Sequence, residues 1–136
     1  MEKYTLTGDI HVLCVTASSF PAGIMAAHKQ LHAMIPFSKD RRYFGLSRPE
    51  GGGSIIYKAA AEELSSAEAV EGIERFTIAQ GEYISIVITD YMKDMQSIGN
   101  AFQQLLAYPG IDLAVGYCLE WYLSDKDVRC MVPLAR

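Results

Sequence analysis

The sequence has no hydrophobic run that approaches the roughly 18 residues of a membrane-spanning helix. Its first residues, Met1-Glu2-Lys3-Tyr4, also lack the charged-then-apolar order of a signal peptide. Because both features are missing, we expect a soluble protein in the cytoplasm with no membrane partner.

Cysteine is scarce, and the spacing of the cysteines indicates neither a disulfide framework nor a metal site. The three cysteines, Cys14, Cys118 and Cys130, are odd in number and none forms a close pair, which disfavours a disulfide framework and a zinc knuckle. All three lie in apolar runs, so we predict small core residues. His28 and His32 are one helical turn apart, but the sequence places no third ligand beside them. We predict no metal and no cofactor.

Positive charge is in deficit. Lys and Arg number 12 against 16 Asp and Glu, a formal net charge of -4. Nucleic-acid binding normally needs a basic face, so we predict no direct contact with nucleic acid. The first expected strand begins about ten residues in, which leaves no room for a helix-turn-helix. Three glycines at 51–53 are not followed by the Gly-Lys-Ser/Thr of a phosphate-binding loop, and we expect an ordinary hairpin connection there.

What the sequence does contain is a regular order of strands and helices. Its 136 residues, half of them hydrophobic, suit one globular domain over 1–136. A β-branched run predicts a strand at 10–17, and apolar residues at helical spacing predict a helix at 21–35, with Pro21 in its first turn. Short strands are predicted at 42–46 and 55–59.

The same order follows in the second half. We expect a hairpin of strands 74–79 and 83–89, then a helix over 91–107 with Asp90 as its N-cap. The helix stripe consists of Met95, Ile98, Phe102, Leu105 and Leu106. Strands at 115–123 and 128–132 complete the chain.

Strand, helix, strand, strand thus occurs twice. We predict an α+β fold of two tandem modules, about 10–60 and about 73–136, joined by an acidic, alanine-rich surface linker at about 61–72. A pseudo-twofold axis would merge the strands into one curved, mostly antiparallel sheet with both helices on one face. The groove between the helices is then the expected ligand site.

Glu120 is the outstanding residue, because it is a single carboxylate inside the apolar and aromatic run 115–123. A buried carboxylate must be paired, protonated or waiting for a positive ligand. Arg42, Arg129 and Lys58 are the candidate internal partners.

Strand alternation places Glu120 and Tyr122 on one face of the sheet, and Tyr117 and Trp121 on the other. The face opposite Glu120 is at least as apolar as its own. Either a bulge re-aims Trp121 towards the groove, or a second copy of the chain covers that face, and we expect a homodimer.

Several short motifs resemble the GyrI-like small-molecule-binding domain, the effector-binding module of AraC-type and MerR-type regulators, here in stand-alone form. The matching stretches run nearly end to end: Phe20-Pro21-Ala22-Gly23, Tyr43-Phe44-Gly45-Leu46, Ile56-Tyr57-Lys58-Ala59, Phe76-Thr77-Ile78, Gly81-Glu82-Tyr83 and Leu119-Glu120-Trp121-Tyr122-Leu123. The resemblance implies a fold that binds lipophilic, often cationic compounds, with Glu120 facing the ligand. The family often has an aliphatic residue at the position of Trp121.

From the residues and the resemblance together we predict a binding protein for lipophilic, cationic, aromatic compounds, acting in drug or effector sensing or sequestration. The predicted ligand-binding residues are Glu120, Tyr122, Trp121, Tyr57, Tyr83, Tyr43, Phe20 and Pro21.

Two alternatives remain open. One is a hydrolase of strained, cyclopropane-type genotoxins, in which Glu120 and a tyrosine, Tyr57 or Tyr122, are catalytic. The other is a gyrase-inhibitor-like regulator that contacts a topoisomerase through the glutamates between Glu62 and Glu74. A separate DNA-binding protein is a further expected partner.

Overall fold

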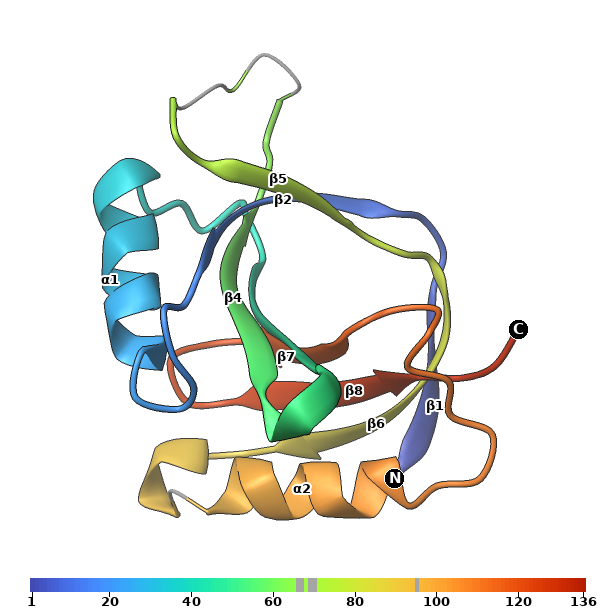
Figure 1. Ribbon diagram of the computed structural model, residues 1–136. Coiled ribbons are helices and arrows are strands. Elements are labelled where there is room, and N and C mark those ends of the chain that lie inside the picture. Colours follow the sequence, from blue (N-terminus) through green and yellow to red (C-terminus); the bar gives the residue numbers. More distant parts are fainter. Residues whose placement is uncertain (66–67, 69–70, 95) are drawn as a thin grey trace.

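The structure is a computed structural model that describes residues 1–65, 68, 71–94 and 96–136. In this part of the chain, eight strands form one curled antiparallel sheet, and two α-helices pack on its outer face (Figure 1). The elements are β1 Glu2–Leu6, β2 Ile10–Thr16, α1 Ile24–Met34, β3 Tyr43–Pro49, β4 Ile55–Glu62, β5 Glu74–Ile78, β6 Gly81–Ile88, α2 Ser97–Leu106, β7 Cys118–Tyr122 and β8 Val128–Pro133, with single 3₁₀ turns at Gly51–Gly53 and Tyr91–Lys93.

The strand order in the sheet is symmetric. It reads β1-β6-β8-β7-β3-β4-β2-β5. Strands β1 to β4 correspond to strands β5 to β8, and each strand lies as far from one edge of the sheet as its counterpart lies from the other edge. A pseudo-twofold axis therefore passes between β7 and β3. The predicted α+β class, the repeated strand-helix-strand-strand order and the single curved sheet are confirmed.

The predicted hairpin of residues 74–79 with 83–89 is wrong. β5 pairs with β2, with Ile10 opposite Ile78, whereas β6 lies between β1 and β8. Both edges of β6 are thus occupied by other strands. One of these two partners is β1, a strand that the sequence analysis did not predict. Only Leu6 of its five residues is buried, so its pattern is weak.

Both helices begin later than predicted. α1 starts at Ile24, and Pro21 lies in the turn before it. α2 starts at Ser97 because Asp94 Oδ1 accepts the backbone N–H of Gln96 in a local turn that interrupts helical bonding. Asp90 has a left-handed backbone with φ 53° and caps no α-helix. The predicted stripe residue Met95 lies outside the described residues.

The helices cover the outer face of the sheet, one over each half. α1 packs on β2 and β4 through Ala27 and Leu31, and α2 packs on β6 and β8 through Ala101 and Leu105. None of the helices among the described residues is long and apolar enough to cross a membrane.

The inner face of the sheet encloses its own core. Phe44, Leu46, Leu119 and Met131 are buried there, with Trp121 packed against them. The curl of the sheet therefore covers the apolar face opposite Glu120, and the argument from this face for a second copy no longer applies. No bulge re-aims Trp121, since β7 pairs in continuous register with β3 and β8.

The segment predicted as a linker starts later than expected, and Glu62, Glu63 and Glu68 in its described part are half-buried. β4 continues through Ala60 and Ala61, which are buried, to Glu62. Glu62 pairs with Arg42 at 2.6 Å, and Glu63 pairs with Arg75 at 3.1 Å.

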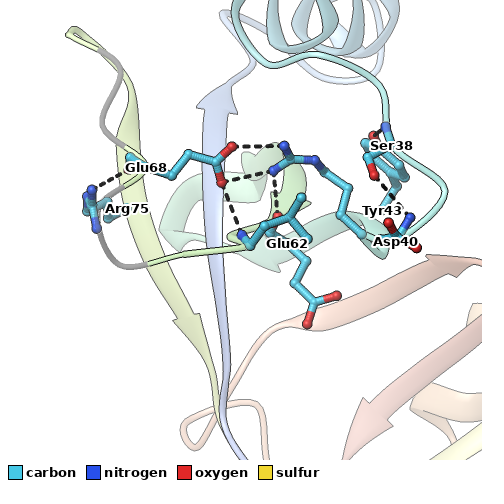
Figure 2. Close-up of polar contacts among 8 residues, drawn as sticks. Ser38, Asp40, Tyr43, Glu62, Glu68 and Arg75 are labelled. Atoms are coloured by element: carbon cyan, nitrogen blue, oxygen red, sulfur yellow. Dashed lines mark hydrogen bonds and ion pairs between the residues drawn. The ribbon is translucent and has the colours of Figure 1, made fainter.

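Glu68 holds a buried arginine. The guanidinium of Arg41 donates from Nη1 and Nη2 to the two oxygens of Glu68 at 3.1 and 2.8 Å, and from Nη1 to the Glu62 carbonyl at 2.8 Å. Glu68 Oε1 also accepts the backbone N–H of Leu64 at 3.0 Å. In Figure 2 the Glu68 carboxylate points toward Glu62, and Arg75 lies on the other side of Glu68. Glu62, Glu63 and Glu68 are each neutralised by an arginine of the same chain.

Candidate functional site

A groove with a cavity volume of about 780 Å³ lies between α1 and α2. This volume falls within the ~300–1,000 Å³ typical of small-molecule sites. β3 and β7, the two strands beside the pseudo-twofold axis, contribute its floor. The lining residues are Phe20, Pro21, Ile24, Met25, His28, His32, Ser47, Arg48, Pro49, Ile55, Tyr91, Met92, Ile98, Gly99, Phe102, Leu106, Cys118, Glu120 and Tyr122.

The walls of the groove are mainly apolar, and flexible side chains line its opening. Met25 and Met92 are 69% and 61% exposed, and Phe20 and Leu106 are also exposed. Methionine side chains are unbranched and polarisable, so they pack against ligands of different shapes. The groove therefore suits a bulky lipophilic molecule.

Glu120 is the only acidic residue of this lining within the described chain. It is half-buried in the middle of β7, opposite Gly45 of β3 and Cys130 of β8. Burial raises the pKa of its carboxyl group, and a hydrogen bond donated by the Tyr122 hydroxyl lowers that pKa in part. Burial therefore makes ionisation of Glu120 less favourable than in water, and a positive ligand would offset that cost.

None of the three candidate internal partners contacts Glu120. Arg42 pairs with Glu62, and Lys58 pairs with Glu74 at 2.5 Å. Arg129 lies 3.5 Å from Glu2. Across the described part of the chain, Glu120 has no cationic partner.

Arg48 belongs to the groove lining, but its guanidinium does not contact Glu120. Its guanidinium lies over the ring of Tyr117, 5.5 Å from the centroid. Tyr117 packs against the inner core of the sheet and does not line the groove.

A row of hydrogen-bonding groups connects the floor to α1. The Tyr122 and Tyr57 hydroxyl oxygens are 3.4 Å apart, and Tyr57 Oη lies 2.8 Å from His28 Nε2. Burial, and secondarily the charge of His32, lowers the pKa of His28 to about 4. His28 is therefore neutral at neutral pH. Of the four side chains in this row, Glu120 is the one that can carry a charge there.

Gly45 makes room for the two tyrosines. A Cβ at this position would clash with the Tyr57 hydroxyl and would lie 3.2 Å from the Tyr122 hydroxyl. The absence of a side chain opposite Glu120 is thus what lets both hydroxyls reach the floor.

Five of the predicted ligand-binding residues gather at this site. Glu120, Tyr122, Phe20 and Pro21 line the groove. Tyr57 is buried beneath it, in ring contact with Phe20 at 6.0 Å.

Trp121 lies on the inner face of the sheet. Its ring contacts Tyr4 at 5.8 Å and Phe44 at 5.9 Å. The alternation of side chains along β7, which puts Glu120 in the groove, puts its neighbour on the other side.

Tyr43 and Tyr83 also lie outside the groove lining. The ring of Tyr43 stacks on Phe37 at 5.5 Å, and its hydroxyl accepts the backbone N–H of Ser38. Tyr83 donates its hydroxyl to the Ala79 carbonyl at 2.6 Å, beside a second, smaller cavity.

Sequence reasoning missed several groove residues, among them His28, Tyr91 and Phe102. Phe102 belongs to the predicted stripe of the second helix, which identifies a buried face, and His28 lies within the first predicted helix. A stripe does not indicate which turns pack on the sheet and which face a cavity.

No family model and no curated protein matches this sequence. Solved structures do match its fold. An integron cassette protein from Vibrio cholerae has a TM-score of 0.72 at 14% identity, covering 98% of this chain and 94% of its own. SAV2435, solved bound to tetraphenylphosphonium, has a TM-score of 0.71 at 14% identity, covering 98% of this chain and 92% of its own.

A hydrolase from Listeria innocua, encoded by lin2189, has a TM-score of 0.57 at 10% identity and covers 98% of this chain and 91% of its own. At these identities the likeness shows the fold alone. The fold is consistent with the small-molecule-binding, GyrI-like effector-binding fold that the sequence motifs predict.

Proposed function

We propose that this protein binds lipophilic, cationic, aromatic small molecules in the groove between α1 and α2, with Glu120 as the counter-charge. The observation that carries the proposal is that Glu120 lies in a mainly apolar groove, accepts a hydrogen bond from a hydroxyl group, and has no cationic partner among the described residues. Sensing or sequestration of such compounds would be the consequence.

The energetics favour a cation over a neutral ligand. A carboxylate and a cation about 4 Å apart attract each other by roughly 4 kcal/mol at the effective dielectric near a protein surface. The aromatic walls add about 0.5–2 kcal/mol for each cation–π contact. Tyr91 and Tyr122 supply two such rings, with centroids 6.2 Å apart.

SAV2435, which shares the fold, is described with a bound lipophilic cation. That fact belongs to SAV2435, and it supports the proposal here because the groove has the volume of a small-molecule site and one carboxylate among the described residues.

The test is a thermal-shift comparison of tetraphenylphosphonium with neutral triphenylphosphine oxide, run on the wild type and on Glu120→Gln. We expect the cation to stabilise the wild type and to lose about tenfold or more in affinity in the variant, since a charge-assisted contact contributes ~1.5–3 kcal/mol. The neutral compound should bind both proteins alike. Equal loss for both compounds, or no stabilisation by the cation, would contradict the proposal.

A second candidate function is hydrolysis of a strained cyclopropane-type electrophile. It is favoured by the contact between a carboxylate of raised pKa and a tyrosine hydroxyl. Glu120 would take a proton from water, the water oxygen would bond to a ring carbon, and the electron pair of the broken C–C bond would move to a substrate oxygen. Once Glu120 is protonated, the Tyr122 hydroxyl would turn from it to hydrogen-bond that oxygen, which would then take up the proton from Glu120. Tyr57 is too buried for this role. Formation of the hydrated product by the wild type, with none in Glu120→Gln, is the expected signature.

The alternative of an acidic surface that contacts a topoisomerase receives no support from the charges. Glu62, Glu63, Glu68 and Glu74 each pair with an arginine or lysine of the same chain, which leaves Glu71 as the glutamate of this stretch without an ion pair among the described residues.

A further inference from the structure

A second cavity, of about 240 Å³, lies on the side of the sheet opposite the groove. It is bordered by β5 with the turn after it, by residues 114–117 before β7, and by Arg48 of β3. Its full lining is Arg48, Phe76, Thr77, Ile78, Ala79, Tyr83, Ala114, Val115, Gly116, Tyr117 and Leu119. No other charged residue belongs to this lining within the described chain.

Arg48 is half-buried, and it differs from the other arginines. Among the residues that the structure describes, its side chain has a ring contact but no hydrogen bond and no ion pair. The other arginines all find acceptors: Arg41 with Glu68, Arg42 with Glu62, Arg75 with Glu63, Arg129 with Glu2, and Arg136 with the Gln80 carbonyl.

The stacking of Arg48 leaves its hydrogen-bonding edge available. A guanidinium donates its N–H groups in its own plane, so contact with an aromatic face uses none of them. Tyr117, the ring beneath it, is held by an edge-to-face contact with Phe76 at 5.0 Å. The charge is thus positioned at the cavity with five donors and no acceptor.

The chemistry that fits such a guanidinium is a carboxylate, which accepts two parallel N–H bonds from the fork. Apart from Thr77 and Gly116, the rest of the lining is aromatic or aliphatic, chiefly Phe76, Ile78, Val115 and Leu119. The cavity volume lies below the ~300 Å³ at which drug-sized sites begin, so the body of the ligand must be small.

We propose that this cavity is a second binding site, which takes a small aromatic monocarboxylate with its carboxylate on Arg48 and its ring against Phe76 and Leu119. The site lies on the other side of the sheet from the cation groove and prefers the opposite charge, although Arg48 belongs to both linings. It does not depend on the proposed function.

Benzoate and its neutral isostere benzamide test the proposal by NMR titration of the isotope-labelled full chain. We expect benzoate to shift the amide signals of Gly116 and Tyr117, and benzamide to bind about tenfold more weakly or less, since hydrogen bonds to a charged group contribute ~1.5–3 kcal/mol. Arg48→Gln should lose benzoate affinity to the same extent, whereas Arg48→Lys should keep part of it.

Two variants serve as controls. Lys39→Gln removes the same charge at an exposed site, and Glu120→Gln alters only the groove, so both should bind benzoate as the wild type does. The dispersion of the amide spectrum shows whether each variant is folded. Equal affinity for benzoate and benzamide, unchanged affinity in folded Arg48→Gln, or benzoate shifts confined to groove residues would overturn the proposal.

Discussion

The Tyr122 hydroxyl donates a 2.7 Å hydrogen bond to Oε1 of Glu120, two residues earlier on the same strand. Residues two apart on a strand share a face, so the bond follows from the sequence spacing itself. It orients the carboxylate while the second oxygen has no hydrogen-bond partner among the described residues. This free oxygen is the atom that a bound cation would meet.

Cation binding should weaken as the pH falls. Burial raises the pKa of Glu120 in the free protein, and a cation needs the ionised carboxylate, so affinity is complete above that pKa and declines as the pH drops through it. His28, with a pKa of about 4, stays neutral over most of this range, and its protonation at lower pH acts in the same direction. Calorimetric titration with tetraphenylphosphonium at a series of pH values measures the decline, and Glu120→Gln should show a flat profile above pH 5. A flat profile in the wild type would contradict this role of Glu120.

Tyr122→Phe should move that profile to higher pH. Without the hydroxyl donor the ionised carboxylate loses its only hydrogen bond among the described residues, so the pKa of Glu120 rises further. We expect affinity near pH 7 to fall by about tenfold or less, and to recover at higher pH. The same calorimetric series tests this. An equal loss at every pH would instead indicate that the hydroxyl contacts the ligand directly.

Gly45→Ala should destabilise the fold. The added Cβ would clash with the Tyr57 hydroxyl, and overpacking of this kind costs about 1–3 kcal/mol in the free energy of unfolding. Urea denaturation measures the loss. In the double variant with Tyr57→Phe the clashing oxygen is removed, so part of the stability should return, and additive losses would show that the hydroxyl is not the obstacle.

Glu68→Gln should also destabilise the protein, because Arg41 would keep its buried charge without a carboxylate. Removing one partner of a fully buried pair costs ~3–5 kcal/mol, and for the partly exposed Glu68 we expect about 2 kcal/mol. Hydrogen bonding from Arg41 lowers the pKa of Glu68, so this contribution is present above the ordinary pKa of 4.5 and is lost as the pH falls below it.

Glu71→Gln is the matched control, since Glu71 is exposed. Urea denaturation at neutral pH and at pH 3 should show a difference between the two variants that shrinks at the lower pH. A constant difference would contradict the electrostatic account.

Local pattern predicted the repeated elements and the position of Glu120, because both rest on short-range spacing. A carboxylate in an apolar run and a tyrosine two residues later are visible without tertiary structure. The prediction that Trp121 lines the groove was wrong, because the sequence does not show that the sheet curls far enough to bury its inner face. The role of Tyr57 depends on Gly45, which lies on a neighbouring strand.

The main error of the sequence analysis was in predicting which strands pair. β1 carries mostly exposed side chains, so its alternation is weak, and its partner β6 lies some eighty residues later in the chain. Adjacent strands 74–79 and 83–89 gave a strong local hairpin signal, but β6 had two other partners. Non-local pairings of this kind leave no periodic trace in either segment.

The symmetric strand order has a consequence for the charge of the groove. Two identical subunits related by a true twofold axis between β3 and β7 would bring two copies of the same glutamate to one floor, and their repulsion would favour a dication or a shared proton. Here one chain supplies both halves, so Glu120 on one central strand faces Gly45 on the other. Covalent joining of the halves thus makes an asymmetric site from a symmetric backbone, with one negative charge and hence one preferred orientation for a singly charged guest.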